Sequence, residues 1–131
     1  MSLLFDTHVL LEILRSTLEL RLSRHERHFI DRQVAVFASA ASIWEIAIKV
    51  RLGKLGIGLP LDDLASYFEA IDIPIVPVNR YHAVVTALPE PPTRDPFDRL
   101  LLAVCKTEGF LLVTEDRALI DHPLAWKPGD D

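Results

Sequence analysis

The stretch that decides the fold runs from Asp95 to Asp116 and reads DPFDRLLLAVCKTEGFLLVTED. Asp95 is a good N-cap and Pro96 suits the first helical position, where its missing N–H is not needed, so a helix is predicted to begin there. Gly109 is placed to end that helix in the left-handed conformation. The run Phe110–Val113 is apolar without alternation, which is typical of a strand buried on both faces of a parallel sheet. The stretch therefore predicts a helix, then a strand, then an acid.

Acidic residues follow two of the predicted strands and begin one of the helices. Asp116 comes just past the strand described above, and Asp98 takes the third helical position, where a carboxylate faces free amides and the positive end of the helix dipole. Leu3–Phe5 is a second short apolar run, and Asp6 stands at its end. Because ligands collect beyond the carboxyl ends of strands in open α/β sheets, these three acids are expected to converge on one rim, with Glu45 as a fourth candidate.

Apolar spacing and turn residues predict the remaining elements. Helices are expected after a cap at Thr7, at Glu19–Arg32, from Ser39 or Ser42 to Gly53, at Leu61–Ile71 and from Asn79 to Leu88. Strands are expected at Ala35–Ser39 and at Ile73–Val78, the latter at an edge of the sheet because it contains prolines. This order predicts a single domain over residues 1–131, with a three-layer α/β fold and a small central parallel sheet flanked by helices.

The composition provides enough apolar residues for a core. Of the 131 residues 50% are hydrophobic, and the mean hydropathy is +0.23. This excess indicates either a well-filled core or an apolar face that a second copy or a partner covers. The single cysteine, Cys105, lies on the apolar side of a predicted helix and is expected to be a core thiol in a reducing cytoplasm. No run is long enough to predict a membrane span, and the N-terminus does not have the layout of a signal peptide.

The charge balance is informative once the acids are taken together. A net charge of −5 argues against a passive nucleic-acid coat, which would be basic, but four acids around one cation would leave the rest of the chain near −1. Two carboxylates about 5 Å apart repel by roughly 3 kcal/mol at an effective dielectric near 20, so a converging set favours a divalent cation between them. Oxygen ligands without a matching histidine or cysteine set favour Mg²⁺ or Mn²⁺. Such ions activate water and stabilise a phosphodiester during hydrolysis, which predicts metal-dependent phosphodiester cleavage.

Four stretches together resemble a known family. They are LLFDTHVLL (Leu3–Leu11), ASIWEIAIKVRLGKL (Ala41–Leu55), RDPFDRLLLAVCKTEG (Arg94–Gly109) and VTED (Val113–Asp116), and they are similar to PIN-domain endoribonucleases of the VapC toxin type. The resemblance implies a Mg²⁺- or Mn²⁺-dependent enzyme that cleaves RNA in the bacterial cytoplasm. It also implies the toxin half of a toxin–antitoxin pair, usually a homodimer, which a small antitoxin protein holds inactive by covering the site.

The same resemblance assigns the ligand acids residue by residue. They are Asp6, Glu45, Asp98 and Asp116, with Asp98 as the second acid of the DPFD motif, which leaves Asp95 as the helix cap. In one respect the chain departs from the family, because members with this motif often carry a histidine where this chain has Thr93. Activity is still implied, whereas the substrate preference stays open.

Each assignment has a simpler alternative. Asp6 can be a helix-start residue, Asp98 can serve only the helix dipole, and Asp116 can begin an ordinary turn. Ser42 and Glu45 form an S-x-x-E pattern, which is typical of a capping box. In that case the Glu45 carboxylate would bond the amide of Ser42 and be lost to the site, and Lys49, one turn further, is placed for an ion pair with it.

Three further residues and the function as a whole have two interpretations. Thr114 can position water or phosphate, or it can make a strand-end hydrogen bond. Arg99 and Arg117 can steer phosphate, or they can form salt bridges with the neighbouring acids. The chain as a whole can be an active ribonuclease or a catalytically silent PIN-like module that binds only a protein partner, and the complete set of acids favours the enzyme.

Overall fold

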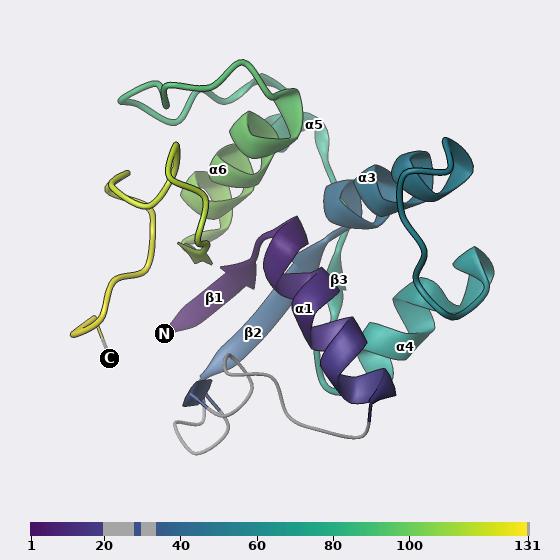
Figure 1. The fold of residues 1–131 in the computed structure, drawn as a ribbon. Helices are drawn as coiled ribbons and strands as arrows, with labels where there is room; N and C mark the ends of the chain where they lie inside the picture. The colour runs from purple at the N-terminus through teal and green to yellow at the C-terminus, as the bar shows by residue number, and fades with distance from the viewer. Residues whose placement is uncertain (20–27, 30–33, 131) are drawn as a thin grey trace.

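The computed structural model describes residues 1–19, 28–29 and 34–130. Within these residues the strands form one parallel sheet in the order β3-β2-β1-β4 (Figure 1), made of β1 (Ser2–Phe5), β2 (Ala35–Ser39), β3 (Ile75–Val76) and β4 (Leu111–Val113). The central strand β1 pairs with both neighbours, so that Leu3 lies opposite Val36 on one side and Leu111 on the other. Parallel pairing brings the carboxyl ends of these strands to the same rim.

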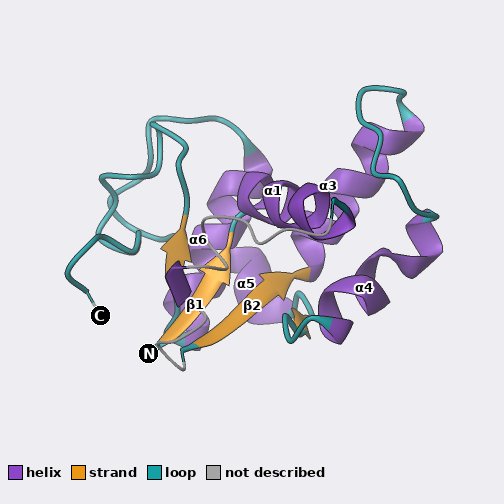
Figure 2. Cartoon of the chain, turned by 60° about the horizontal axis from the view of Figure 1, so that its bottom comes forward, coloured by secondary structure: helices purple, strands orange, loops and turns teal. Residues whose placement is uncertain are grey.

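Helices pack on both faces of the sheet. Those in the described residues are α1 (Thr7–Leu18), α3 (Ala40–Arg51), α4 (Leu64–Ala70), which follows a 3₁₀ turn η1 (Leu61–Asp63), α5 (Arg80–Val84) and α6 (Pro96–Glu108). Side chains of β1 alternate between the two faces, because Leu3 and Phe5 join the core under α1 and α4 whereas Leu4 joins the core under α6. Figure 2 shows β1 and β2 side by side among these helices. The predicted three-layer α/β fold is confirmed.

The residues predicted to begin and end the helix in the stretch Asp95–Asp116 act as predicted. The Asp95 carboxylate accepts a hydrogen bond from the Phe97 amide at 2.8 Å, and Pro96 is the first helical residue. Gly109 ends α6 with φ of 76°, and its N–H donates to the Cys105 carbonyl at 2.9 Å. Cys105, a residue of α6, is buried in the core, and this burial raises the pKa of its thiol. The strand that follows begins at Leu111, one residue later than predicted.

The structure corrects one predicted helix start and decides another. The cap of α1 is Asp6 and not Thr7, because an Asp6 carboxylate oxygen accepts the Val9 amide at 2.9 Å. The cap of α3 is Ser39, whose hydroxyl accepts the Ala41 amide at 3.0 Å. Ser42 and Glu45 therefore lie inside α3, and the alternative in which they form a capping box is wrong. Sequence alone could not decide between the two serines, because each stands near a plausible helix start.

The helix predicted from Asn79 to Leu88 is shorter than expected. Its cap is confirmed, but α5 ends at Val84, and Val85 is extended with ψ of 135°. The reason is a tertiary contact, because His122 Nε2 lies 3.4 Å from the Ala87 carbonyl and 2.8 Å from the Pro89 carbonyl. These bonds and the burial of Ala87 hold the segment in a path that a helix could not follow.

The other expected elements differ less from the structure. The helix expected at Leu61–Ile71 is η1 followed by α4, and the expected edge strand Ile73–Val78 is confirmed as the short edge strand β3. The helix expected at Glu19–Arg32 falls almost entirely outside the described residues, and Glu19 itself ends α1. No helix among the residues that the structure describes is long and apolar enough to cross a membrane.

Gly109→Ala is expected to lower the free energy of unfolding by about 1 kcal/mol, because only the backbone conformation opposes the added methyl group. Nothing lies within 4 Å of the position that a Cβ would take at Gly109 or at Gly56, but only Gly109 has a positive φ. Gly56→Ala is therefore a matched control that we expect to be neutral or slightly stabilising. Denaturant unfolding measures both variants, and equal effects would contradict the left-handed cap.

Candidate metal centre

The fold delivers three of the predicted acids to one rim of the sheet. Asp6 follows β1, Asp116 lies just past β4, and Asp98 stands in the first turn of α6. Since β1 and β4 are adjacent and parallel, their ends coincide, and the Asp6 amide donates to the Val113 carbonyl at 3.1 Å. The first turn of α6, which Asp95 caps and which contains Asp98, lies beside the same rim, as the charge interactions described below indicate.

Asp6 is the most deeply held of these acids. Only 4% of it is exposed, and both of its carboxylate oxygens have partners. Oδ1 accepts the Val9 amide at 2.9 Å as the cap of α1, and Oδ2 accepts a hydrogen bond from the Thr114 hydroxyl. The Thr114 hydroxyl oxygen in turn accepts the Asp116 amide at 3.0 Å. Thr114 thus links the two strand-end acids and does more than make an isolated strand-end hydrogen bond. Asp6 both caps α1 and lies at the rim.

Asp98 and Asp116 are also tied to nearby groups. The Thr93 hydroxyl lies 3.4 Å from Asp98 Oδ2, and its oxygen accepts the Asp95 amide at 3.1 Å. Thr93, the residue that departs from the family pattern, is therefore a direct neighbour of a site acid. Asp116 Oδ1 accepts the Ala118 amide at 2.9 Å, so the turn expected for Asp116 is present together with its place at the rim.

The pKa values show that these carboxylates interact. Partial burial raises the pKa of Asp98 to about 6, and the negative charges of neighbouring carboxylates add to this shift. Those neighbours are Asp95, Asp116, Glu45 and Asp6. Burial also raises the pKa of Asp6, against the lowering effects of its hydrogen bonds and of His8, while Asp116 adds to the rise. The acids therefore lie close enough to destabilise one another's ionised forms.

Glu45 differs from the other acids because it has a counter-ion. Its carboxylate is 8% exposed and leans from inside α3 toward the start of α1, where Oε1 accepts the Thr7 hydroxyl at 2.7 Å. The other oxygen, Oε2, pairs with the Lys49 ammonium at 2.8 Å, which confirms the predicted ion pair. Ser42 is also part of this group, because its hydroxyl is hydrogen-bonded to that of Thr7 at 3.0 Å. Glu45 thus lies near the rim with both oxygens already occupied.

The donor set fits an oxygen-ligated divalent ion in an open site. Among the described residues, no three histidine, cysteine, aspartate or glutamate side chains are close enough to enclose an ion. Mg²⁺ is usually held by one or two carboxylates and keeps several waters, so it does not need such a cage. The mutual repulsion of Asp6, Asp98 and Asp116 is the electrostatic property that a bound cation would relieve.

Comparison with known families gives one match, to the PIN domain, over residues 3–123. The chain belongs to the PIN domain family. A comparison with curated proteins gave no match. PIN domains are commonly nucleases and typically use divalent metal ions, so this match supports a nuclease, and thus a hydrolase, in general terms.

The two arginines beside the site acids, Arg99 and Arg117, have different surroundings in this PIN domain. The Arg99 guanidinium donates to the Thr93 carbonyl at 2.8 and 3.1 Å and pairs with Glu90 at 3.4 Å. Arg99 therefore fixes the linker before α6. It forms a salt bridge, but its partner is Glu90 and not a neighbouring site acid. Arg117 is exposed beside Asp116.

Sequence reasoning missed the hydroxyl groups that hold the acids in place. Thr7 and Ser42 were considered only as caps, yet they bind Glu45 directly or through one another. Thr93 was noted only as a departure from the family pattern, yet its hydroxyl contacts Asp98. The adjacency of Thr7 to Asp6 in the sequence is the one signal that could have indicated a role at the rim.

The raised pKa of Asp98 predicts a pH effect on stability without metal. Its value of about 6 in the folded chain lies above the ordinary 3.8, so as pH rises through this window the unfolded chain loses the proton first. The folded chain then holds more protons, and the free energy of unfolding falls with rising pH. Asp98→Asn is expected to flatten this fall. Denaturant unfolding in EDTA between about pH 4 and 7 measures it, and parallel curves for the parent and the variant would contradict the coupling.

Proposed function

We propose that this PIN domain is a Mg²⁺- or Mn²⁺-dependent endoribonuclease that hydrolyses RNA phosphodiesters. The observation that carries the proposal is the convergence of Asp6, Asp98 and Asp116 on one rim, where burial and neighbouring negative charges raise the pKa values of Asp6 and Asp98. Converging carboxylates repel one another unless a cation binds between them, and PIN domains typically bind divalent metal ions. The resemblance of the motifs to VapC-type toxins supports RNA as the substrate.

The four acids would hold the ion, one or two of them directly and the others through its waters, and each acid has a partner that orients it. When bound, Mg²⁺ or Mn²⁺ supplies an activated water and compensates the charge that builds on the phosphodiester. The Thr114 hydroxyl fixes the Asp6 carboxylate beside the Asp116 backbone, and the Thr93 hydroxyl contacts Asp98. These bonds reduce the freedom of the carboxylates before substrate arrives, which is the kind of preorganisation that lowers reaction barriers.

Glu45 is the fourth proposed ligand, but its existing contacts limit this role. Its two oxygens are bonded to Thr7 and Lys49, so it can act as a ligand only by sharing one of them or by giving one up. The Lys49 charge also lowers the electrostatic benefit of a cation at this carboxylate. We therefore assign Glu45 the weakest ligand role of the four.

We further propose that the chain is the toxin of a toxin–antitoxin pair, a homodimer in the cytoplasm that a small antitoxin inhibits. The apolar runs of the sequence place the expected partner surface along Leu10–Leu22 and Leu61–Ile71, of which residues 20–22 lie outside the described part of the chain. In the described part, Leu10, Leu64 and Phe68 are fully buried in the chain's own core. Much of the apolar excess therefore fills the core.

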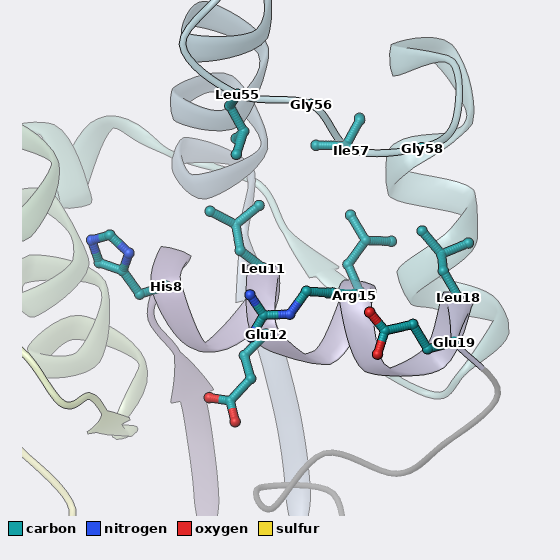
Figure 3. A pocket seen from close by; sticks show the side chains of 11 residues that line it. His8, Leu11, Glu12, Arg15, Leu18, Glu19, Leu55, Gly56, Ile57 and Gly58 are labelled. Atoms are coloured by element: carbon teal, nitrogen blue, oxygen red, sulfur yellow. The ribbon is translucent and has the colours of Figure 1, made fainter.

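A groove along α1 is one part of the described surface where a partner can bind. It lies between α1 and residues 55–58 (Figure 3), has a volume of 610 Å³, and is lined by Leu11, Leu18 and Ile57 among others. His8 lies at its end nearest the acids, two residues after Asp6. A partner bound along α1 would therefore reach the edge of the site.

One observation favours the second candidate, a catalytically silent interaction module. The Lys49–Glu45 ion pair supplies a positive charge from within the protein and takes up part of the role of a metal ion. A silent module would keep the fold and the α1 groove, and it would neither bind a divalent ion at the rim nor cleave RNA.

The experiment that separates the two candidates combines melting with RNA cleavage. Mg²⁺ or Mn²⁺ is expected to raise the melting temperature of the parent relative to EDTA, because binding to the folded state stabilises it. Asp6→Asn and Asp98→Asn should lose most of this rise and about a hundredfold or more of the cleavage rate, with unchanged circular dichroism. Asp62→Asn removes the same charge from an exposed position on η1 and serves as the control. A parent without cleavage and without a metal-dependent rise would establish the silent module.

A further inference from the structure

Two aromatic side chains form an exposed pair next to the acids. Trp44 is 60% exposed, and its ring centroid lies 5.6 Å from that of Phe97 at an interplanar angle of 68°. Trp44 belongs to α3 and Phe97 to α6, two helices that contact each other. In an edge-to-face pair of this kind, the partner covers at most one face of the indole. The exposed fraction of Trp44 shows that much of the ring is left to solvent.

The pair is placed at the rim by its neighbours in sequence. Trp44 directly precedes Glu45, and Phe97 directly precedes Asp98, so both helices present an aromatic residue one position before a site acid. Adjacent Cα atoms are about 3.8 Å apart, so the backbone of each aromatic residue lies next to that of a site acid. Phe97 also lies in the first turn of α6, which begins at this rim.

The exposure of Trp44 is not required by packing. The next two residues, Glu45 and Ile46, are buried, so they lie on the side of α3 that faces the core. Trp44, the largest side chain of the helix, lies outside the core. Single exposed apolar residues are common on proteins. An indole that is both exposed and adjacent to a site for RNA hydrolysis has a more specific use, because every base has a flat face on which an aromatic ring can stack.

The charges on α3 indicate which form of nucleic acid fits. Arg51 is exposed and stands seven residues after Trp44, which places the two on the same side of the helix, and the exposed Lys54 follows. Aromatic rings combined with cations along a path are the features that bind single strands, with the rings stacking on bases and the cations contacting phosphates. In a duplex the bases are already stacked on one another and cannot reach such a ring.

We propose that Trp44, supported by Phe97, is a stacking platform for an unpaired base of single-stranded RNA beside the bond to be cleaved. The proposal rests on the proposed ribonuclease function and adds a binding residue to it. Arg51 would contact the backbone of the same strand. Stacking of one base would hold the RNA across the acids, so Trp44 contributes to binding and not to the chemical step.

The test measures the binding of a short unpaired RNA by fluorescence anisotropy. Asp98→Asn serves as the background so that the RNA stays intact, and Trp44→Ala is added to it. We expect Kd to rise about fivefold or more, whereas Trp44→Phe should stay near the background because phenylalanine also stacks. Tyr81→Ala is the matched control, since Tyr81 is 61% exposed but its neighbour His82 contacts Glu108, at the end of α6 far from Phe97.

A second RNA identifies the base as the contact. In an oligonucleotide with abasic nucleotides, Trp44→Ala and its background should bind equally, because the stacking partner is gone. A Trp44→Ala variant that binds intact RNA like its background, or that loses the same affinity on abasic RNA, would overturn the platform even if the parent cleaves RNA. A parent that neither cleaves nor binds unpaired RNA with Mg²⁺ or Mn²⁺ would instead overturn the proposed function, and the platform with it.

Discussion

Parallel pairing of β1 with β4 is the constraint on which the rest of the site depends. It places Asp6 and Asp116 at the same end of the sheet, where the Thr114 hydroxyl links the Asp6 carboxylate to the Asp116 backbone. The register is fixed by buried side chains on both faces of β1, since shifting it by one residue would move Leu3 and Leu4 to the wrong cores. The fold therefore stabilises an arrangement of charges that is unfavourable on its own.

The acids at this rim are not equivalent. Asp98 is partly buried among like charges and has a pKa near 6, whereas Glu45 has the Lys49 ammonium at 2.8 Å. An ion is expected to gain most at the acids that have no ion pair among the described residues, which are the ones at the strand ends and at the start of α6. The helices that carry Glu45 and Asp98, α3 and α6, also carry the exposed aromatic pair Trp44 and Phe97, so part of the proposed ion site and the proposed RNA contact share the same two helices.

Much of this architecture could be predicted from the sequence, because its signals are local. The cap at Asp95 and the left-handed Gly109 fix both ends of α6, and a strand followed by an acid identifies Asp6 as a rim residue. Long-range contacts could not be predicted in this way. His122 ends α5 early by bonding the Ala87 and Pro89 carbonyls from a distant part of the chain. The choice between Ser39 and Ser42 as the cap, and thus the direction of Glu45, also depended on the tertiary fold.

The central claim is that the rim acids form one site for a divalent ion, and paramagnetic NMR with Mn²⁺ tests it most directly. Substoichiometric Mn²⁺ broadens the signals of nuclei close to where it binds. The account predicts that the backbone amide signals of Thr7, Asp98 and Asp116 disappear first, while those around the exposed Asp62 persist. Broadening that begins at Asp62, or that spreads evenly over the acidic surface, would contradict it.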